Sequence, residues 1–324
     1  MSGKSRCWSV CRVTARFILA AALSASLLVA CAPGQQPARS EVNAGVSTVR
    51  RDITYRTVDG VSLTMDVYTP KGKGSGPFPA VMYVHGGGWK AGDKGEGAGF
   101  TEAPELLARG YVVVSINYRL APKYTVPIQI EDVKYAVRYL KSNSKGFNID
   151  PDRLGAMGSS AGGHLVSLLG VTGPEDGLEG DFDLPAKSSR VRAVVDMFGP
   201  ADLEEAAFAK LQAKTVQDAF GLHDLGEAAL PVLRKYSPVT YVSQDDPPFL
   251  IVHGDKDATV PLSQSEAFYK ALKEAGVPAT LLVVKNGGHS LKPAGGAISP
   301  PRPEVSKAVA DFFDQVLSPS RPTP

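Results

Sequence analysis

Cysteine and net charge are both scarce in this sequence of 324 residues. The three cysteines, Cys7, Cys11 and Cys31, all precede residue 32, so no disulfide can form within the rest of the chain. This excludes a small fold stapled by disulfides, and the domain must be stabilised by its hydrophobic core. The formal net charge is +2, and lysine and arginine are spread along the chain, so nothing indicates binding to nucleic acid.

Acidic residues are absent before Glu41, and an apolar run lies within this segment. Four basic side chains precede the run, residues 17–30, which is too short to span a bilayer as a helix. The run ends in Leu28-Val29-Ala30-Cys31, which resembles a bacterial lipobox. That resemblance implies a lipoprotein signal peptide over residues 1–30. It also implies export and a lipid anchor on Cys31 in a bacterial cell membrane, on the periplasmic or cell-surface side. An ordinary secretory signal cut near this point is the alternative.

Residues 31–49 are rich in proline, glycine, glutamine, serine and alanine, and they show no apolar period. This composition predicts a flexible tether. We find no internal repeat and no domain boundary beyond the tether. We therefore expect one domain over residues 50–318, followed by a tail over residues 319–324.

Short apolar runs alternate with helical patterns throughout residues 50–318. The first two runs flank Asp59-Gly60, a turn pair that predicts a β-hairpin over residues 53–68. Further strands are expected at residues 78–84, 111–116, 154–157, 191–197, 249–252 and 280–284. Helices are expected at residues 102–109, 127–141, 164–171, 263–274 and 303–317. The alternation predicts an α/β fold with a mostly parallel central sheet and helices on both faces.

Residues 201–243 interrupt this alternation. Their helical patterns are short and scattered, and the segment is longer than an ordinary connection between a helix and a strand. We expect a small cap insertion over an active site, with a long helical crossover as the alternative. Phe208, Leu211 and Phe220 in this segment, together with Trp89, either line the pocket or belong to the core.

The segment Gly158-Ser159-Ser160-Ala161-Gly162 matches the pattern G-x-S-x-G. An apolar run precedes it and an apolar-periodic run follows it, which is the strand–turn–helix context of a nucleophile elbow. On so sharp a turn, only small residues two positions either side of the serine let the backbone pass, and Gly158 and Gly162 provide that room. The following helix directs its N-terminal N–H groups to the same place. The alternative is an ordinary glycine-rich turn of an α/β domain.

A second glycine cluster, His85-Gly86-Gly87-Gly88-Trp89, follows the strand expected at residues 78–84. Consecutive glycines allow backbone N–H groups to face a cleft without side chains in the way. The cluster is typical of the HGGG-type loop that supplies one side of an oxyanion hole. A flexible glycine linker is the alternative. We expect His85 to hold this loop rather than to act as a base.

An acid and a base each follow a later strand, at the sheet edge where catalytic groups of open α/β sheets gather. Asp257 follows residues 249–252, and we favour it over Asp255, which we expect to bind N–H groups of its own turn. His289 follows residues 280–284 on a glycine-flanked loop that suits a base. Of the remaining histidines, His164 is expected to pack under the elbow, His223 to be solvated, and His253 to brace the turn that carries Asp257.

These segments, together with Asn117-Tyr118-Arg119-Leu120-Ala121-Pro122, resemble the α/β-hydrolase esterases. The chain order Ser, Asp, His is the order of that superfamily. Residues 50–318 are similar to small bacterial carboxylesterases, which are grouped with feruloyl, acetyl-xylan and hormone-sensitive-lipase-like esterases. The sequence departs from the hormone-sensitive-lipase pattern because it lacks the long helical N-terminal cap.

The resemblance implies a serine esterase that hydrolyses short acyl or aryl esters, with acetylated or feruloylated sugars among the candidates. Ser160 is then the nucleophile, His289 the base and Asp257 the acid of a catalytic triad that works through an acyl-enzyme. The oxyanion-hole N–H groups come from Gly87, Gly88 and Ala161. No metal or organic cofactor is implied, and the expected partners are a small-molecule ester and the membrane.

Two other functions stay open at this point. Residues 254–261 also resemble prolyl-oligopeptidase-type peptidases, and formamidases share an HGG-type loop, so amide cleavage is the first alternative. In that case Glu204 and Glu205 would be candidates to hold a free amine. A lipid-anchored binding protein that has lost catalysis is the second alternative, and it predicts a broken triad or elbow.

Overall fold

The computed structural model describes residues 46–317, except residues 73, 96–97, 182 and 187. The expected signal peptide, Cys31, most of the expected tether and the tail over residues 319–324 lie outside the described residues. Within the described part, no helix has both the length and the apolar composition needed to cross a membrane.

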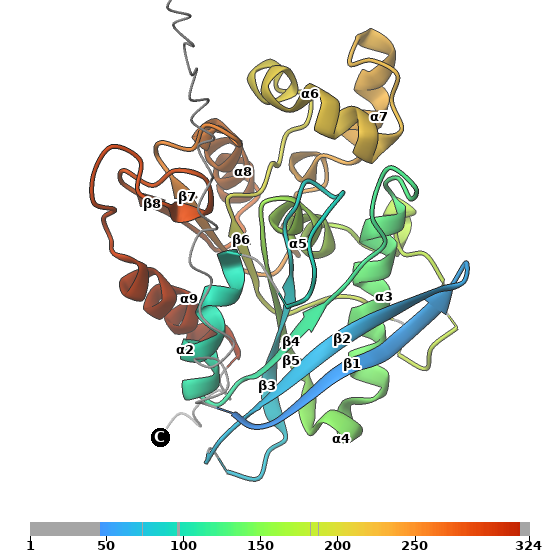
Figure 1. Cartoon of the computed structure of the whole chain (residues 1–324), viewed down its shortest axis with the longest axis vertical. Coiled ribbons are helices and arrows are strands. Elements are labelled where there is room, and N and C mark those ends of the chain that lie inside the picture. Colours follow the sequence, from blue (N-terminus) through green and yellow to red (C-terminus); the bar gives the residue numbers. More distant parts are fainter. Residues whose placement is uncertain (1–45, 73, 96–97, 182, 187, 318–324) are drawn as a thin grey trace, which may run out of the picture. The chain divides into compact units, whose positions relative to one another are not determined.

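In the described residues, an eight-stranded sheet forms the centre of the domain (Figure 1). Its spatial order is β1-β2-β4-β3-β5-β6-β7-β8. The strands are β1 (Val46–Val58), β2 (Val61–Pro70), β3 (Phe78–Val84), β4 (Val112–Ile116), β5 (Ile149–Ser159), β6 (Val194–Met197), β7 (Phe249–Gly254) and β8 (Ala279–Val284). The pairs β1–β2 and β2–β4 are antiparallel, and the other pairs are parallel. The parallel strands therefore end at one edge of the sheet, where the loops that carry the candidate site meet.

The central strands are continuous apolar runs because both faces of the sheet are covered. In β3, Ala80 and Met82 pack into one hydrophobic cluster, whereas Val81 and Tyr83 pack into the other. Successive side chains of a strand point to opposite faces, so one apolar run serves two cores.

Helices cover both faces of this sheet. On one face, apolar side chains of α3 (Ile128–Ser142), α5 (Ala161–Val171) and α8 (Leu262–Glu274) fill the first cluster. On the other face, α2 (Ala103–Ala108) and α9 (Arg302–Leu317) fill the second cluster. Short elements connect them, namely α4 (Ser144–Phe147), η1 (Ala98–Glu102), η2 (Pro174–Asp176) and η5 (His289–Leu291).

The predicted fold class, an α/β fold with a mostly parallel sheet and helices on both faces, is confirmed. Two strands begin well before their predicted bounds, β6 begins three residues later than predicted, at Val194, and the ends of the other strands differ by at most two residues. β1 begins at Val46, inside the segment expected to be a tether, because Val46 and Val49 pack against the second cluster. β5 begins before residues 154–157 because Ile149 pairs with Phe78 of β3 and is buried.

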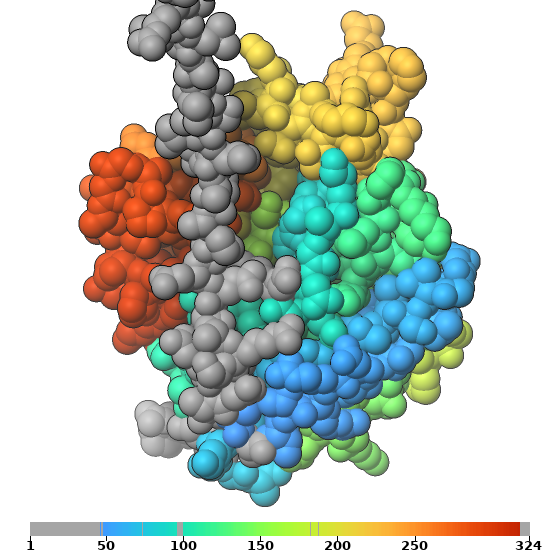
Figure 2. All heavy atoms as spheres, in the orientation of Figure 1, coloured from blue at the N-terminus to red at the C-terminus, as the bar shows by residue number. Residues whose placement is uncertain are grey.

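Residues 201–243 form a helical segment between β6 and β7. It contains α6 (Ala206–Phe220), η3 (Glu227–Ala229), α7 (Leu230–Lys235) and η4 (Pro238–Thr240). Its atoms, coloured yellow to gold, gather in one group in Figure 2. The backbone of α6 leaves helical geometry at Gln212, where φ is −115° and ψ is 17°. Phe208, Val216 and Phe220 anchor α6 in the first hydrophobic cluster, so this helix is part of the core.

Candidate active site

Ser160 lies on the turn between β5 and α5, with φ 55° and ψ −120°. A side chain on backbone with positive φ is strained, so its neighbours must leave room. A Cβ atom on Gly158 would lie 2.2 Å from the Gly162 carbonyl oxygen, and one on Gly162 would lie 2.1 Å from the Val84 carbonyl oxygen. The close packing of the backbone at this turn therefore requires glycine at both positions. The predicted strand–turn–helix is present.

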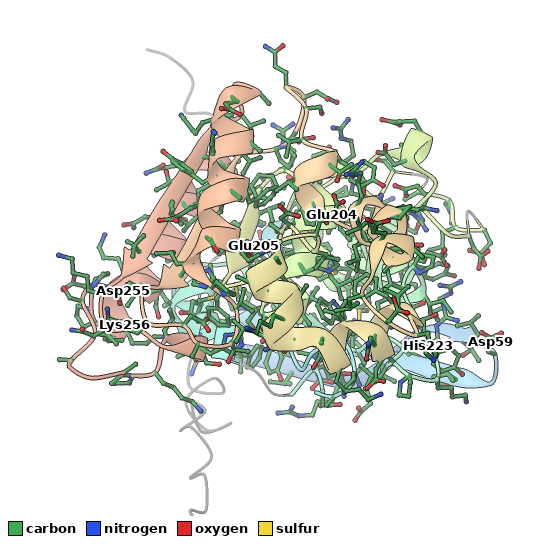
Figure 3. All side chains as sticks on the ribbon, turned by 90° about the horizontal axis from the view of Figure 1, so that it is seen from above. Asp59, Glu204, Glu205, His223, Asp255 and Lys256 are labelled. Atoms are coloured by element: carbon green, nitrogen blue, oxygen red, sulfur yellow. The ribbon has the colours of Figure 1, made fainter. Side chains whose placement is uncertain are left out.

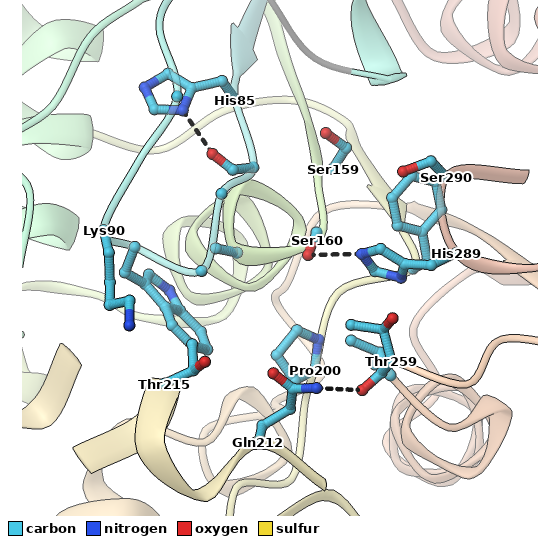
Figure 4. Close-up of a pocket in the computed structure, with 18 of the residues that line it drawn as sticks. His85, Lys90, Ser159, Ser160, Pro200, Gln212, Thr215, Thr259, His289 and Ser290 are labelled. Atoms are coloured by element: carbon cyan, nitrogen blue, oxygen red, sulfur yellow. Dashed lines mark hydrogen bonds between the residues drawn. The ribbon is translucent and has the colours of Figure 1, made fainter. Parts of the chain in front are cut away.

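Ser160, His289 and Asp257 form one hydrogen-bonded chain. The Ser160 hydroxyl donates to Nε2 of His289 over 3.1 Å, as Figure 4 shows. The Nδ1–H group of His289 donates to Oδ2 of Asp257 over 2.7 Å. The His289 side chain is 25% exposed, whereas the Asp257 side chain is buried. The structure thus brings together the three residues that were expected at separate strand ends, with the imidazole at the pocket and the carboxylate shielded.

Asp257 is held in its charged form. Its other oxygen, Oδ1, accepts the N–H groups of Thr259 (2.8 Å) and Val260 (3.0 Å). Nε2 of His253 lies 2.9 Å from the Val260 carbonyl oxygen and 3.5 Å from Asp257 Oδ2. Burial opposes ionisation, but the contacts with His253 and His289 outweigh it and hold the pKa of the Asp257 carboxyl well below its usual value.

Asp255 does not play the part expected for it. The N–H groups of this turn are bound by the carboxylate of Asp257 and not by that of Asp255. Thr259 and Val260 follow Asp257 by two and three residues, which is the spacing of an Asx-turn. In the described part of the chain, Oδ1 of Asp255 is buried without a hydrogen-bond partner. Figure 3 shows Asp255 and Lys256 at the outer margin of the domain.

The glycine loop after β3 passes close to the elbow. A Cβ atom on Gly86 would lie 2.7 Å from a carbonyl oxygen of β5. Gly87 and Gly88 follow with φ of 112° and 61°, conformations that glycine adopts readily. Both line the same pocket as Ser160 and Ala161. Their backbone therefore borders the space in which a carbonyl group would meet the Ser160 hydroxyl.

His85 is buried against this loop. Its Nδ1 atom lies 2.7 Å from the Gly86 carbonyl oxygen, and its ring stacks on Tyr118 with 4.4 Å between the ring centroids. The Tyr118 hydroxyl donates to the His85 carbonyl oxygen over 3.1 Å. Burial lowers the pKa of His85, which favours the neutral ring. These contacts agree with a histidine that holds the loop.

The triad and the glycine loop open onto a pocket of about 490 Å³ (Figure 4). Its apolar wall includes Trp89, Phe198 and Phe208. Polar side chains of Lys90, Gln212, Thr215, Thr259 and Ser290 also line it. Sequence reasoning missed Phe198 and all five polar residues. Phe198 directly follows β6 at the same sheet edge, so the strand-end rule that indicated Asp257 and His289 would have indicated it too.

Helix α6 borders the pocket and contacts it at two places. Nε2 of Gln212 donates to the Thr259 carbonyl oxygen over 3.1 Å. Nζ of Lys90, in the glycine loop, donates to Asp218 over 3.0 Å. Among the apolar residues singled out in this segment, Phe208 lines the pocket, whereas Leu211 is 53% exposed. Whether residues 201–243 open and close as a lid stays a prediction.

The remaining histidines contact protein groups or solvent. His164 is buried one helical turn after Ser160, and His253 contacts the acid turn and Ser265. His223 is fully exposed (Figure 3). The described residues contain no group of three or more His, Cys, Asp and Glu side chains placed to hold a metal ion.

Glu204 and Glu205 are bound to other side chains. Arg234 donates to both carboxylate oxygens of Glu204, at 2.9 Å each. Glu205 accepts from Ser263 over 2.6 Å and from Gln264. Neither glutamate lines the pocket, so the structure offers no support for an amine site built from this pair.

Two family models match the chain. The BD-FAE model matches residues 65–272, and the TAP-like protein model matches residues 223–322. The first match covers the elbow and Asp257, and the second covers Asp257 and His289.

Several named proteins similar to this chain are esterases. Esterase LipC of Mycobacterium tuberculosis is 30% identical over 290 residues, which are 86% of this chain and 70% of LipC. Esterase LipQ of the same organism is 30% identical over 236 residues, but the chain spans only 55% of its length. A truncated carbohydrate esterase from gut microbiota has a solved structure that is 30% identical, with a TM-score of 0.72. That match covers 85% of this chain and 98% of the other.

Proposed function

Since the chain belongs to the BD-FAE family of α/β-hydrolase esterases and is a carboxylic ester hydrolase, we propose that it works as a serine esterase. Ser160 is the nucleophile, His289 the base and Asp257 the acid. The observation that carries the proposal is their hydrogen-bonded chain at a pocket bordered by a glycine loop. The N–H groups of the oxyanion hole belong to Gly87, Gly88 and Ala161.

In this mechanism, His289 Nε2 takes the hydroxyl proton as Ser160 Oγ attacks the ester carbonyl. The bond from Nδ1–H to ionised Asp257 fixes the tautomer and stabilises the imidazolium. The oxyanion is stabilised by preorganised N–H groups, each contributing about 3 kcal/mol to lowering the barrier. His289 then protonates the departing alcohol, and water, activated by the same imidazole, hydrolyses the acyl-enzyme.

The proposed substrates are short acyl or aryl esters, including acetylated or feruloylated sugars. The pocket of about 490 Å³ is large enough for a small acyl or aryl group against Trp89, Phe198 and Phe208. The polar side chains of Gln212, Thr215 and Thr259 on its wall suit an alcohol part that carries hydroxyl groups. Similarity to a carbohydrate esterase supports the sugar alcohol.

Replacement of the nucleophile tests the mechanism. We expect Ser160→Ala to abolish hydrolysis of p-nitrophenyl acetate and labelling by a fluorophosphonate, with the circular dichroism spectrum unchanged. Ser62→Ala, an exposed serine on β2, is the control and should behave as wild type. Turnover by Ser160→Ala above a tenth of the wild-type rate would rule out the proposed nucleophile.

A substrate panel tests the reaction class. Acetate, butyrate, octanoate and feruloyl esters and acetylated sugars should give the highest kcat/KM for short acyl and aryl groups. Aminoacyl-p-nitroanilides should be inert, because Glu204 and Glu205 are bound elsewhere. Preferential cleavage of the anilides would favour the amidohydrolase alternative.

The location is a separate proposal that depends on the sequence. We propose that residues 1–30 direct export and that lipid on Cys31 anchors the enzyme to a bacterial cell membrane. Metabolic labelling with radioactive palmitate should label the wild type but not Cys31→Ala. Equal labelling of both would exclude this anchor.

A further inference from the structure

The loop that borders the proposed oxyanion hole has three successive residues with positive φ. Gly87 and Gly88 have φ of 112° and 61°, and Trp89 continues with 61°. Glycine adopts such angles at little cost, but a bulky aromatic residue does not, and the strain is on the order of 1–3 kcal/mol. Contacts of the Trp89 side chain must therefore hold the loop in this shape.

Those contacts are specific. Trp89 is 2% exposed, and its indole Nε1–H group donates to Nδ1 of His164 over 3.2 Å. The Trp89 ring meets the rings of His164 and Phe220 edge to face, with centroid separations of 5.3 Å and 5.6 Å. The loop is thus fastened to α5, the helix that begins after Ser160, and to α6.

His164 can serve this bond in only one form. Its Nδ1 accepts from Trp89, and its Nε2 lies 2.7 Å from the Tyr236 carbonyl oxygen, which needs a donor. The ring is therefore neutral with its proton on Nε2. Burial lowers the pKa of His164 to about 4, so the neutral form persists at neutral pH.

We propose that His164 is a positioning residue that sets the N–H groups of Gly87 and Gly88 through Trp89. This inference depends on the proposed serine esterase mechanism. Oxyanion donors act only when they lie at hydrogen-bond distance from the developing charge, so a small displacement of the loop lowers kcat. Substrate binding in the ground state depends less on these donors, so KM changes little.

The test removes the bond from either side. Trp89→Phe keeps an aromatic ring but loses the donor, and His164→Phe keeps a ring but loses both nitrogens. With p-nitrophenyl acetate we expect kcat to fall 10- to 100-fold in each variant. KM should change less than threefold in His164→Phe, whose side chain does not line the pocket, whereas Trp89→Phe also alters the pocket wall and is judged by kcat. Affinity for a trifluoromethyl ketone, which mimics the tetrahedral intermediate, should weaken in parallel with kcat/KM.

The double variant separates positioning from packing. His164→Phe leaves the buried indole N–H of Trp89 unpaired, and the added Trp89→Phe removes that group, so the double variant should melt higher than His164→Phe; the Tyr236 carbonyl oxygen lacks its donor in both. The kcat of the double variant should stay low, because the bond is still missing. Tyr111→Phe is the control: it removes a buried hydroxyl's bond to Asp314 away from the pocket, and it should lower stability without changing kcat.

Two results would overturn the inference. One is a kcat within threefold of wild type in Trp89→Phe, and the other is recovery of kcat together with stability in the double variant. If His164→Phe does not fold, Trp89→Phe decides alone. A wild type that neither hydrolyses esters nor reacts at Ser160 would end the proposed function itself, whereas an active, labelled wild type with an unaffected Trp89→Phe would end only this inference.

Discussion

Asp257 divides its two carboxylate oxygens between different partners. Oδ2 accepts from His289, and Oδ1 accepts from the backbone of Thr259 and Val260. The carboxylate that binds His289 therefore also shapes its own turn. The Thr259 carbonyl in turn accepts from Gln212, so this one residue connects the imidazole to the α6 side of the pocket.

We expect Asp257→Asn to lower kcat about 10³- to 10⁴-fold while the protein stays folded. The carboxamide oxygen can keep the N–H groups of the turn, so its NH₂ group faces Nδ1 of His289. The imidazole must then accept at Nδ1 and carry its proton on Nε2, where it cannot take one from Ser160. Steady-state kinetics and thermal melting measure the two effects, and a loss below tenfold would contradict this role of the carboxylate.

The pH dependence of stability provides a second residue-scale prediction. His164 titrates near 6.5 in the unfolded chain, but burial lowers its pKa to about 4 in the folded protein. Between these values the unfolded state binds more protons, so acidification destabilises the wild type but not His164→Phe through this group. The difference in unfolding free energy between the two should shrink by about 3 kcal/mol from pH 7.5 to 4. Urea titrations across this range measure it, and a constant difference would contradict the buried neutral ring.

At the scale of single residues, the sequence predicts which residues form the site better than it predicts which partners they contact. Ser160, Asp257 and His289 follow from strand ends and chain order, because parallel strands bring those ends to one edge. The error about Asp255 arose because the direction of N–H groups in a turn depends on its backbone angles. The Trp89–His164 bond joins residues 75 apart, and no local pattern indicates it.

The strand–turn–helix of β5 and α5 is the element on which the site depends. Gly158 and Gly162 are required there because a Cβ atom at either position would lie only 2.1–2.2 Å from a backbone carbonyl oxygen, not because the turn must be flexible. The pattern G-x-S-x-G therefore predicts the element well, because it records a steric requirement.

Gly158→Ala should be severely destabilising. The new Cβ would lie 2.2 Å from the Gly162 carbonyl oxygen, a backbone atom that cannot move without shifting α5. We expect less soluble protein, a melting temperature lower by at least about 5 °C, and loss of esterase activity. Gly146→Ala is the matched control, since nothing lies within 4 Å of the added atom, and it should melt as wild type. Equal behaviour of the two variants would refute the steric account.

Helix α6 shows where element prediction fails. Its register is interrupted at Gln212, and this residue faces the pocket and bonds to the Thr259 carbonyl. The sequence around Gln212 contains no glycine or proline to mark the interruption. Tertiary contacts decide the local backbone there, so periodicity alone predicts only scattered helix.

Stability of the whole domain also depends on a buried charge cluster outside the pocket. Glu179 accepts from Lys134 over 2.5 Å and from Arg138 over 2.7 Å, and Ser189 donates to both of its oxygens. The side chains of Lys134 and Arg138 are fully buried, and both belong to α3. The cluster fixes the connection between α5 and β6 against α3.

Glu179→Gln should destabilise the domain by about 3–5 kcal/mol, because it removes the buried carboxylate that Lys134 and Arg138 share. The melting temperature should fall by about 10 °C. None of these residues lines the pocket, so kcat/KM at 25 °C should stay within twofold of wild type. Lys270→Gln, which breaks an exposed pair with Glu274, should leave the melting temperature unchanged. A Glu179→Gln variant as stable as wild type would contradict the importance of the cluster.

The strand order of the whole sheet was beyond sequence reasoning. Apolar runs identify strands, but β4 lies between β2 and β3 because of pairings that local patterns do not record. The hairpin predicted at Asp59-Gly60 depends on a local turn signal and is confirmed by the antiparallel pairing of β1 with β2. The fold class was predictable because alternation of strands and helices already favours a parallel sheet.

Trp89, Ser160, Phe198 and Ser290 all border the pocket, and all four have positive φ. Glycine at any of them would relieve the backbone and would also enlarge the range of shapes available to the loop. At these positions, a substitution that raises the stability of the protein is therefore expected to lower its catalytic rate. Directed evolution for heat tolerance would do better to reinforce distant supports, such as the connection held by Glu179, than to relax the rim of the catalytic cavity.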